Sequence, residues 1–491
     1  MNKNIKGSET TDELIWGPAA LAARREEVRR HQAQFAQTRE KWITKNTYFY
    51  NSIKRVLQFI IEPKKRVLNL RCQTGFLLDA LNPSDGIGVD VSQEMVGIAR
   101  QRYPQFEFVK ADPEDLSLNK RFDYILFDHV SDTVDVLSAF RRLKDLCEPH
   151  TRLVIYTYNH LWQPIVKLAE RLRLKMPMPE QNWLSETDLC GLLLLSGFEW
   201  LRVYRVVIFP KWIPLLSGFL NRFVARLPLF NKLCMSIVVV ARPAPKQLDP
   251  NSISVSVIVP CKNERENIKP AVQRIPDMGK HTEIIFCDDK STDGTADEVN
   301  QMQHKYPERD IKLVEGPGIC KAENVWTGLE IAKGDVLMIL DADLTVMPEE
   351  LPNFFKALIE GKGEFINGSR LVYPMQKMAM KFTNMLGNKV FSTVFSYLLG
   401  QKIKDTLCGT KVFWRTEWER MKPILDLWGT DRWGDYKLLF SASKLHLRIA
   451  DLPIHYQERV FGATKMVRVF KNGLIMLRMC LIGFIRLKMG F

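Results

Sequence analysis

Short apolar runs typical of strands alternate with helical segments twice along the 491-residue chain. The first series occupies residues 66 to about 160 and gains a last strand at Ser236, and the second series begins at Val255. A polar, proline-rich segment separates the two series. Strands joined by crossover helices form parallel sheets that helices cover on both faces. The pattern therefore predicts two doubly wound α/β domains in series.

The alternation also sets the expected domain boundaries. A chain of this length has room for two to four domains at roughly 100–200 residues each. We expect a helical N-terminal extension over 1–44, a first α/β domain over 45–242, a linker over 243–253, a second α/β domain over 254–465 and an amphipathic helix over 466–491. Because Arg478, Arg486 and Lys488 interrupt the apolar run of that last helix, we expect it to lie in a membrane interface and not to span a bilayer.

The net charge of +14 is concentrated in three stretches that lack acidic residues. These lie between Glu199 and Asp249, between Glu364 and Asp405, and after Glu458, with eight, six and seven basic residues. All three are also rich in large apolar residues. That mixture suits phospholipid head groups above acyl chains better than a nucleic-acid groove. It predicts that the protein binds a membrane surface and no nucleic acid. The alternative is that the three stretches are core helices whose basic side chains are solvated.

The N-terminus and the cysteines bear on the compartment. The first 14 residues lack the apolar segment of a secretory signal. The nine cysteines form no C-x-x-C pair and no metal-ligand spacing, which is typical of free thiols in a reducing compartment. We therefore expect a peripheral protein on the cytoplasmic side of the cell membrane, or otherwise a cytoplasmic one.

Carboxylates follow three strands of the second domain. Ligands gather at the carboxyl ends of strands in open parallel sheets. Asp341 and Asp343 are two apart on an extended segment, so both can reach one cation, and their hard oxygen atoms suit Mg²⁺ or Mn²⁺ bound to a substrate pyrophosphate. The other polar residues at these strand ends are Asn263, Glu264, Asp288, Asp289 and Asp293.

The ordered set VIVPCKNE, DDKSTDGT and GDVLMILDAD resembles the family 2 glycosyltransferases of GT-A fold, from Val255 to about Lys465. Within that family the likeness is to polyprenyl-phosphate sugar synthases of the dolichyl-phosphate mannosyltransferase type. The resemblance implies a metal at Asp341 and Asp343, where Thr345 replaces a frequent glutamine and leaves one metal ligand open. It also implies that a nucleotide-sugar donor contacts Pro260, Glu264, Asp288, Asp289, Asp341 and Ala342.

Basic residues of the same domain match positions that the family uses to hold phosphates. The resemblance implies catalytic roles for Arg370, Arg459 and Lys465, and contacts of Lys411, Arg459 and Lys465 with an acceptor phosphate. A phosphate acceptor is already an anionic nucleophile, so cations and positioning are the main requirements. The segment 371–404 resembles the amphipathic interface helices of such synthases.

Asp435 matches the acidic residue that serves as general base in family members with hydroxyl acceptors. A base is useful only where the acceptor has a proton to lose. With a phosphate acceptor, Asp435 organises the acceptor site; with a hydroxyl acceptor, it is the catalytic base. The sequence leaves both alternatives open.

The segment RVLNLRCQTGFLLDAL and the strands after it resemble class I S-adenosylmethionine-dependent methyltransferases over about residues 45–242. The resemblance implies a Rossmann-like fold, with S-adenosylmethionine near Gly75, Asp90 and Asp112. The family's glycine-rich loop is degenerate, however, because Asn69, Arg71 and Gln73 replace its acid and two of its glycines. We expect Arg71 to crowd the cofactor or fill its place. An active methyltransferase and a non-catalytic scaffold both stay open.

The leading interpretation is a metal-dependent glycosyltransferase that moves a sugar from a nucleotide donor to a polyprenyl phosphate or another lipid-linked acceptor at the cytoplasmic membrane face. The first alternative uses a glycan or lipid hydroxyl as acceptor. The second is a methyltransferase with an accessory sugar-binding domain. The intact carboxylate motifs beside the degenerate glycine loop argue against the second. A non-catalytic membrane adaptor is the last alternative.

Overall fold

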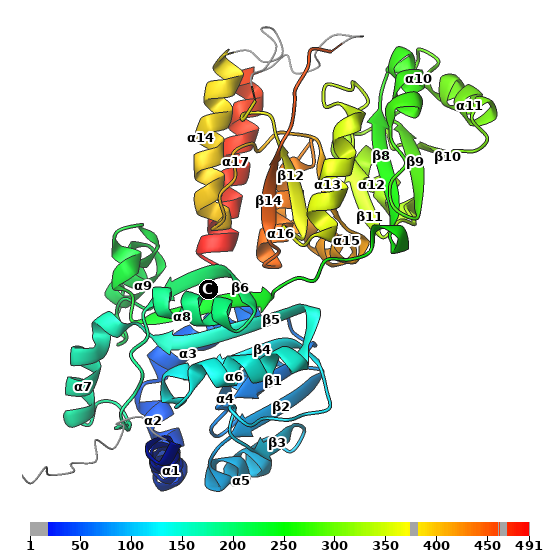
Figure 1. Cartoon of the computed structure of the whole chain (residues 1–491). Coiled ribbons are helices and arrows are strands. Elements are labelled where there is room, and N and C mark those ends of the chain that lie inside the picture. The colour runs from blue at the N-terminus through cyan, green and yellow to red at the C-terminus, as the bar shows by residue number, and fades with distance from the viewer. Residues whose placement is uncertain (1–17, 374–381, 460, 462–468, 491) are drawn as a thin grey trace, which may run out of the picture. The chain divides into compact units, whose positions relative to one another are not determined.

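The computed structural model describes residues 18–373, 382–459, 461 and 469–490 (Figure 1). The chain divides into two compact units, Met1–Ala244 and Pro245–Phe491. The division falls in the segment predicted as a linker. We call them unit 1 and unit 2.

Unit 1 is built on a seven-stranded sheet with the order β3-β2-β1-β4-β5-β7-β6. The first five strands in this order are parallel, and β7 is antiparallel to both β5 and β6. The bounds are β1 Arg66–Leu70, β2 Asp85–Asp90, β3 Glu107–Lys110, β4 Phe122–Asp128, β5 Cys147–Tyr158, β6 Phe198–Val206 and β7 Ser236–Pro243.

Helices cover this sheet and extend from it (Figure 1). The amphipathic helices α3 and α6 each bury an apolar stripe, which is the usual way in which a surface helix attaches to a core. The helices are α1 Pro18–Phe35, α2 Arg39–Lys45, α3 Thr47–Ile60, α4 Phe76–Leu81, α5 Gln93–Arg102, α6 Val136–Leu143, α7 Gln163–Arg171, α8 Glu186–Leu195 and α9 Leu216–Arg222. Unit 1 also contains the short 3-10 helices η4 His160–Trp162 and η6 Phe230–Leu233.

Unit 2 has a second seven-stranded sheet with the order β10-β9-β8-β11-β13-β12-β14. Strands β10, β9, β8 and β11 are parallel, whereas β13 is antiparallel to both β11 and β12. The bounds are β8 Ser254–Cys261, β9 His281–Asp288, β10 Asp310–Glu315, β11 Val336–Ile339, β12 Phe365–Ser369, β13 Lys411–Trp414 and β14 Ile449–Pro453.

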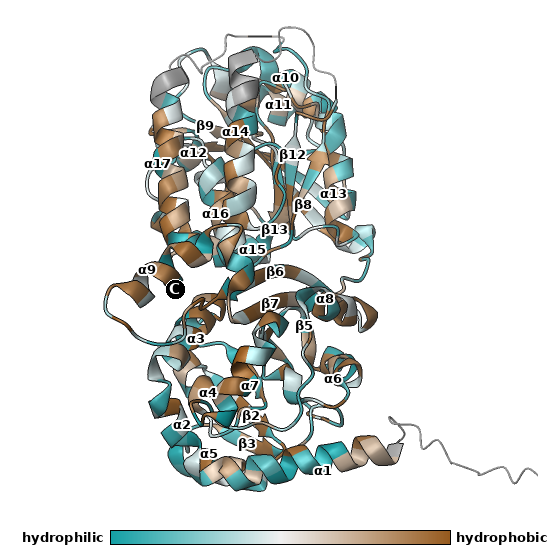
Figure 2. Ribbon diagram, turned by 90° about the vertical axis from the view of Figure 1, so that its left-hand side faces the viewer, coloured by the Kyte–Doolittle hydropathy of each residue, from teal (hydrophilic) through white to brown (hydrophobic). Residues whose placement is uncertain are grey.

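The helices of unit 2 flank the sheet, and α14 and α17 lie side by side at one end of it (Figures 1 and 2). Among the residues that the structure describes, no helix is both long enough and apolar enough to cross a bilayer. The helices are α10 Arg265–Arg274, α11 Thr295–Lys305, α12 Lys321–Ile331, α13 Leu351–Ile359, α14 Phe382–Leu399, α15 Arg415–Met421, α16 Asp435–Lys444 and α17 Val469–Lys488.

The prediction of two α/β domains is confirmed, and each parallel sheet also contains one antiparallel strand, β7 in unit 1 and β13 in unit 2. Strand β6 was not predicted. Its buried and half-exposed residues alternate, as they do in an edge strand with one covered face. Strands β12, β13 and β14 were also missed, because short strands that pair with distant partners leave little periodicity in the sequence.

Candidate active site

The carboxyl ends of β8, β9 and β11 open onto one cavity of about 530 Å³ in unit 2. Parallel pairing aligns these three ends, so each strand delivers its following loop to the same edge of the sheet. The residues predicted from the sequence that line this cavity are Pro260, Glu264, Asp289, Asp341, Ala342, Asp343, Asp435 and Arg459.

Asp341 forms an ion pair with Lys321, the first residue of α12. Burial alone would raise the pKa of the Asp341 carboxyl, but the charge of Lys321 lowers it below its ordinary value. The carboxylate also packs tightly against Gly409, where a Cβ atom would lie 2.2 Å from the Asp341 Oδ2 atom. The backbone at Gly409 therefore leaves no space for a side chain beside Asp341.

Asp343 is held from two sides. Its Oδ1 atom accepts hydrogen bonds from the backbone N–H and the hydroxyl of Thr345, at 3.1 and 2.8 Å. Its Oδ2 atom lies 2.5 Å from the guanidinium of Arg459, which also contacts Glu264 at 3.3 Å. Thr345, which replaces the glutamine that is frequent in the family, thus orients the Asp343 carboxylate.

Asp288 and Asp289 are adjacent in sequence but differ in position. Asp289 lines the cavity, and its carboxylate accepts from the Gly318 N–H at 2.8 Å and from Lys262 at 3.0 Å. Asp288 is not among the residues that line the cavity, and its Oδ2 atom accepts from the Ser291 N–H at 3.1 Å. Asp289 is therefore the one placed to meet a ligand.

Asp435 begins α16 and is paired with Lys411 at 2.9 Å. Burial raises the pKa of the Asp435 carboxyl above its ordinary value, and Lys411 opposes only part of that effect. Lys411 is fully buried and also donates to the carbonyl of Cys408. Asp435 lines the cavity, whereas Lys411 does not line it and contacts the Asp435 carboxylate.

Arg370, one of the predicted catalytic residues, is not among the described residues that line the cavity. The guanidinium of Arg370 forms a two-point contact with the fully buried carboxylate of Asp405, at 2.7 and 2.9 Å. It also lies 5.2 Å from the ring centre of Tyr456. Arg370 thus ties the end of β12 to the segment before β13, and Lys465 lies outside the described residues.

The cavity contains residues that sequence reasoning missed. Lys321 is the most important of them because it touches Asp341. One sequence feature could have indicated Lys321: it follows a glycine-containing turn between a strand and a helix. The other missed residues include Lys262, Asn324, Arg432, Trp433 and Asn472.

The donor set fits one divalent cation. Within the described ranges, no group of three or more His, Cys, Asp or Glu side chains could hold a metal ion by protein ligands alone. Mg²⁺, however, is commonly held by one or two carboxylates and completes its shell with water and substrate phosphates. Asp341 and Asp343 provide that pair on the wall of the cavity, with Lys321 and Arg459 as their counter-charges.

The loop after β1 in unit 1 keeps the backbone conformation of a glycine-rich loop although two of its glycines are replaced. Arg71, Gln73 and Gly75 have φ values of 57°, 52° and 83°, in the left-handed region that favours glycine. The side chains of Arg71 and Gln73 are buried. Arg71 donates to the carbonyl of Asp132 at 2.9 Å, and Gln73 accepts from Arg39 of α2.

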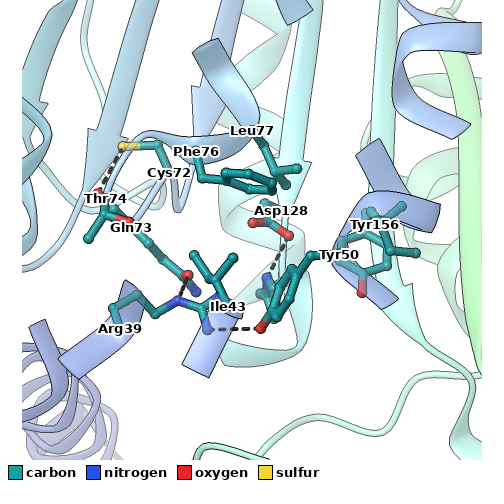
Figure 3. Close-up of a pocket in the computed structure, with 12 residues that line it drawn as sticks. Arg39, Ile43, Tyr50, Cys72, Gln73, Thr74, Phe76, Leu77, Asp128 and Tyr156 are labelled. Atoms are coloured by element: carbon teal, nitrogen blue, oxygen red, sulfur yellow. Dashed lines mark hydrogen bonds and ion pairs between the residues drawn. The ribbon is translucent and has the colours of Figure 1, made fainter. Parts of the chain in front are cut away.

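The neighbouring cavity is almost filled (Figure 3). Arg39 reaches both Gln73 and the hydroxyl of Tyr50, the latter at 2.8 Å. The remaining space is about 10 Å³, which is enough for one water molecule. Asp90 is buried, and its two carboxylate oxygens accept from the N–H groups of Gln73 and Ser92 at 2.9 and 3.0 Å.

Part of each unit matches a known family. Residues 42–203 match the family described as Methyltransferase domain, and residues 256–417 match Glycosyl transferase family 2. The dolichol-phosphate mannosyltransferase of Saccharomyces cerevisiae is 42% identical over 113 residues, which are 22% of this chain and 42% of that protein. An undecaprenyl-phosphate 4-deoxy-4-formamido-L-arabinose transferase of Salmonella paratyphi B is 25% identical over 217 residues, covering 43% and 62%.

A comparison of structures finds a possible histamine N-methyltransferase of Thermotoga maritima, with 18% identity and a TM-score of 0.35. The match covers 44% of this chain and 99% of that one. The chain spans less than two thirds of the length of the curated relatives just named.

The sheet order, the strand-end carboxylates and the family matches define unit 2 as a GT-A domain of glycosyl transferase family 2. Residues 42–203 form a methyltransferase domain of Rossmann-like fold. The chain is therefore a methyltransferase domain fused to a family 2 glycosyltransferase domain, which confirms the resemblance drawn from the sequence.

The residues of unit 1 do not fit S-adenosylmethionine. Sites for ligands of that size occupy roughly 300–1,000 Å³, against the 10 Å³ left here. Asp90 already accepts from two backbone N–H groups, and Gly75 is hemmed in by Tyr103 and Phe108. Asp112 is not among the residues that line this cavity, and its Oδ1 atom accepts from the Glu114 N–H. We derive no methyl transfer through this unit.

Calorimetry of the full-length protein with S-adenosylmethionine is expected to show no saturable binding. The double variant R71G/Q73G removes both side chains from backbone that already suits glycine, so it should remain folded and gain measurable affinity. A thermal melt checks that the variant is folded. Saturable micromolar binding to the unaltered protein would contradict the view that its own side chains fill the site.

Proposed function

We propose that unit 2 transfers a sugar from a nucleotide-sugar donor to a polyprenyl phosphate. The observation that carries this proposal is one cavity in which Asp341 and Asp343 are each paired with a basic side chain, Lys321 and Arg459. Its volume of about 530 Å³ lies within the range of small-molecule sites. The relatives named for dolichol-phosphate and undecaprenyl-phosphate transfer support the choice of acceptor.

The donor is held at the strand ends. Glu264 and Asp289 face the part of the cavity nearest β8 and β9, where we place the nucleoside, beside Pro260. Asp341 and Asp343 hold Mg²⁺ or Mn²⁺, which would offset the negative charge that develops on the departing diphosphate. Arg459 and Lys321 are cations of the chain itself at the same place. They position the phosphates and reduce the repulsion between donor and acceptor.

The acceptor site lies near Asp435. A phosphate acceptor has no proton that must be removed, so in this proposal Asp435 organises the site together with Lys411, whose burial makes it a positioning residue. The presence of Asp435 in the cavity also supports the alternative of a hydroxyl acceptor, with Asp435 as the catalytic base.

A lipid-linked acceptor calls for contact with a membrane. Helices α14 and α17 contain no acidic residue, and α17 exposes Leu474, Leu477, Leu481 and Ile485 along one face with Arg478 beside them. We propose that this helix pair lies at the bilayer surface, which makes the protein peripheral. Part of the predicted interface segment, residues 374–381, lies outside the described residues.

The test is a screen of radiolabelled nucleotide sugars with Mn²⁺, in the presence and absence of a polyprenyl phosphate. We expect label in the organic phase only when the polyprenyl phosphate is present. Label that appears only in water-soluble glycans would refute the polyprenyl proposal and favour the hydroxyl acceptor.

The double variant D435N/K411M separates the two acceptor classes, because it removes the buried charge pair without leaving either partner alone. With a phosphate acceptor we expect transfer to stay within about tenfold of the unaltered protein. Loss of a general base would cost about 10²–10⁴-fold. A loss of that size would therefore assign the base role to Asp435. Denaturation curves of both proteins control for misfolding.

A further inference from the structure

Unit 1 exposes large apolar side chains in two segments far apart in sequence, residues 161–174 and 211–233. Exposure is greatest at Leu215 and Leu229, which are 93% and 82% exposed. In the first segment Ile165 and Leu168 of α7 and Leu172, which caps the end of that helix, are exposed at helical spacing. Single exposed apolar residues are normal on proteins, but a contiguous group marks an interaction surface.

Hydrogen bonds hold the start of the first segment against the end of the second. The indole N–H of Trp162 in η4 donates to the carbonyl of Leu233 at 2.8 Å. The side-chain amide of Asn159 donates to the carbonyls of Lys232 and Cys234, at 3.0 and 2.9 Å. We call this surface the α7–α9 face, and Figure 2 shows the apolar colour along α9.

The loop that carries Leu215 is held in place by side-chain hydrogen bonds. The hydroxyl of the buried Ser217 accepts from the Ile213 N–H at 2.5 Å and donates to the carbonyl of Lys211 at 2.7 Å. Asn221 accepts from the N–H groups of Ile208 and Phe209, and its amide donates to Tyr48 of α3 at 3.0 Å. The loop is therefore tied to the body of unit 1 while Leu215, with a positive φ of 63°, points its side chain into solvent.

The net charge of the face is positive. Residues 200–248 contain eight basic side chains and no acidic one, and Lys211, Arg222 and Lys232 are exposed among the apolar residues. On α7, the acidic Glu170 is paired with Lys175 at 2.7 Å, while Lys167 and Arg171 are exposed. Apolar side chains that can enter acyl chains, surrounded by cations at head-group level, are the combination that binds anionic bilayers.

We propose that the α7–α9 face docks onto an anionic phospholipid bilayer. Leu215 and Leu229 enter the acyl region, and Arg222 and Lys232 contact lipid phosphates. This contact lies on the methyltransferase unit and is separate from α14 and α17 of unit 2. It therefore stands whether or not the proposed glycosyl transfer is correct.

The experiment is flotation of the full-length protein with vesicles of phosphatidylcholine alone and of equimolar phosphatidylcholine and phosphatidylglycerol. We expect binding to the mixed vesicles only, and a fall of about tenfold or more in L215S/L229S, because two exposed leucines lose their apolar burial. The matched control is L194S/L195S on α8, which alters two leucines of the same unit that are also strongly exposed but lie outside the face. We expect that control to bind like the unaltered protein.

Two further readouts keep the outcome clear. R222Q/K232Q should lose the preference for phosphatidylglycerol. A fluorophore attached to L215C should shift to shorter wavelength on mixed vesicles, relative to the unaltered protein labelled in the same way; this reports insertion even if unit 2 also binds lipid. Equal effects of the two leucine pairs, or no shift at position 215, would overturn the proposal.

A protein partner is the competing occupant. If L215S/L229S changed the mass of the protein in sedimentation equilibrium but not its binding to vesicles, the face would be an interface between copies of the chain and the proposal would fail. Transfer to a polyprenyl phosphate in detergent should be unchanged in L215S/L229S, so a failure here is distinguishable from a failure of the proposed function.

Discussion

Asp341→Asn is expected to lower sugar transfer by about 10²–10³-fold while the protein remains folded. The substitution removes one of the two carboxylates that hold the metal, and it leaves Lys321 without the charge that it contacts. Groups that stabilise charge developing in the transition state are typically worth this much. The measurement is the initial rate of transfer as a function of Mn²⁺ concentration, and we expect that added Mn²⁺ will not restore the full rate.

The matched control is Asp426→Asn, because Asp426 is an exposed aspartate of the same unit and lies outside the cavity. Its rate should equal that of the unaltered protein. A rate of Asp341→Asn within about threefold of the control would contradict both the metal site and the role of Lys321 as its counter-charge, since the effect expected of such a group is far larger.

Asp405→Ala is expected to lower the free energy of unfolding by about 3–5 kcal/mol, the usual cost of removing one partner of a buried ion pair. Arg370 would keep its charge but lose the fully buried carboxylate that accepts two hydrogen bonds from its guanidinium. Denaturant unfolding measures the loss. The double variant R370M/D405L removes both charges together and should recover part of the loss. The rest should remain, because the Asn388 amide and the N–H groups of Arg370 and Leu407 also donate to Asp405 and would lose their acceptor.

The same pair makes stability depend on pH. Burial alone would raise the pKa of the Asp405 carboxyl, but the charge and hydrogen bonds of Arg370 lower it well below its ordinary value. The stabilisation is therefore present above the pKa of an unfolded aspartate, near ~4, and is lost as the pH falls below it. A loss of less than about 1 kcal/mol in Asp405→Ala, which is what an exposed pair would give, would contradict a structural role for Arg370.

The sequence predicted what depends on local pattern. Alternating strands and helices are visible in short windows, and parallel pairing then brings Glu264, Asp289, Asp341 and Asp343 to one edge without any knowledge of side-chain contacts. The cavity residues nearest the strands were found for that reason. Asp435 and Arg459 came from the family resemblance, and both line the same cavity, where Arg459 is paired with Asp343 and Glu264.

The missed features depend on partners that are distant in the chain. Nothing near Arg370 in sequence shows that Asp405 will bury and occupy its guanidinium. The sequence around Lys411 is typical of an exposed lysine, but the side chain is buried and paired with Asp435. The antiparallel strand β13 exists only because it fits between β11 and β12. Pairings of this kind are set by tertiary packing, which single-sequence patterns do not contain.

The filled loop of unit 1 has a consequence for regulation. A protein that binds a metabolite gains stability in proportion to RT ln(1 + [L]/Kd), so its folded population follows the supply of that metabolite. Here Arg71 and Gln73 are buried and bonded to other parts of the chain, so the loop is held by contacts that the chain always carries. The stability of unit 1 should therefore be the same in cells rich or poor in methyl donor, and the domain attached to it would work independently of methylation status.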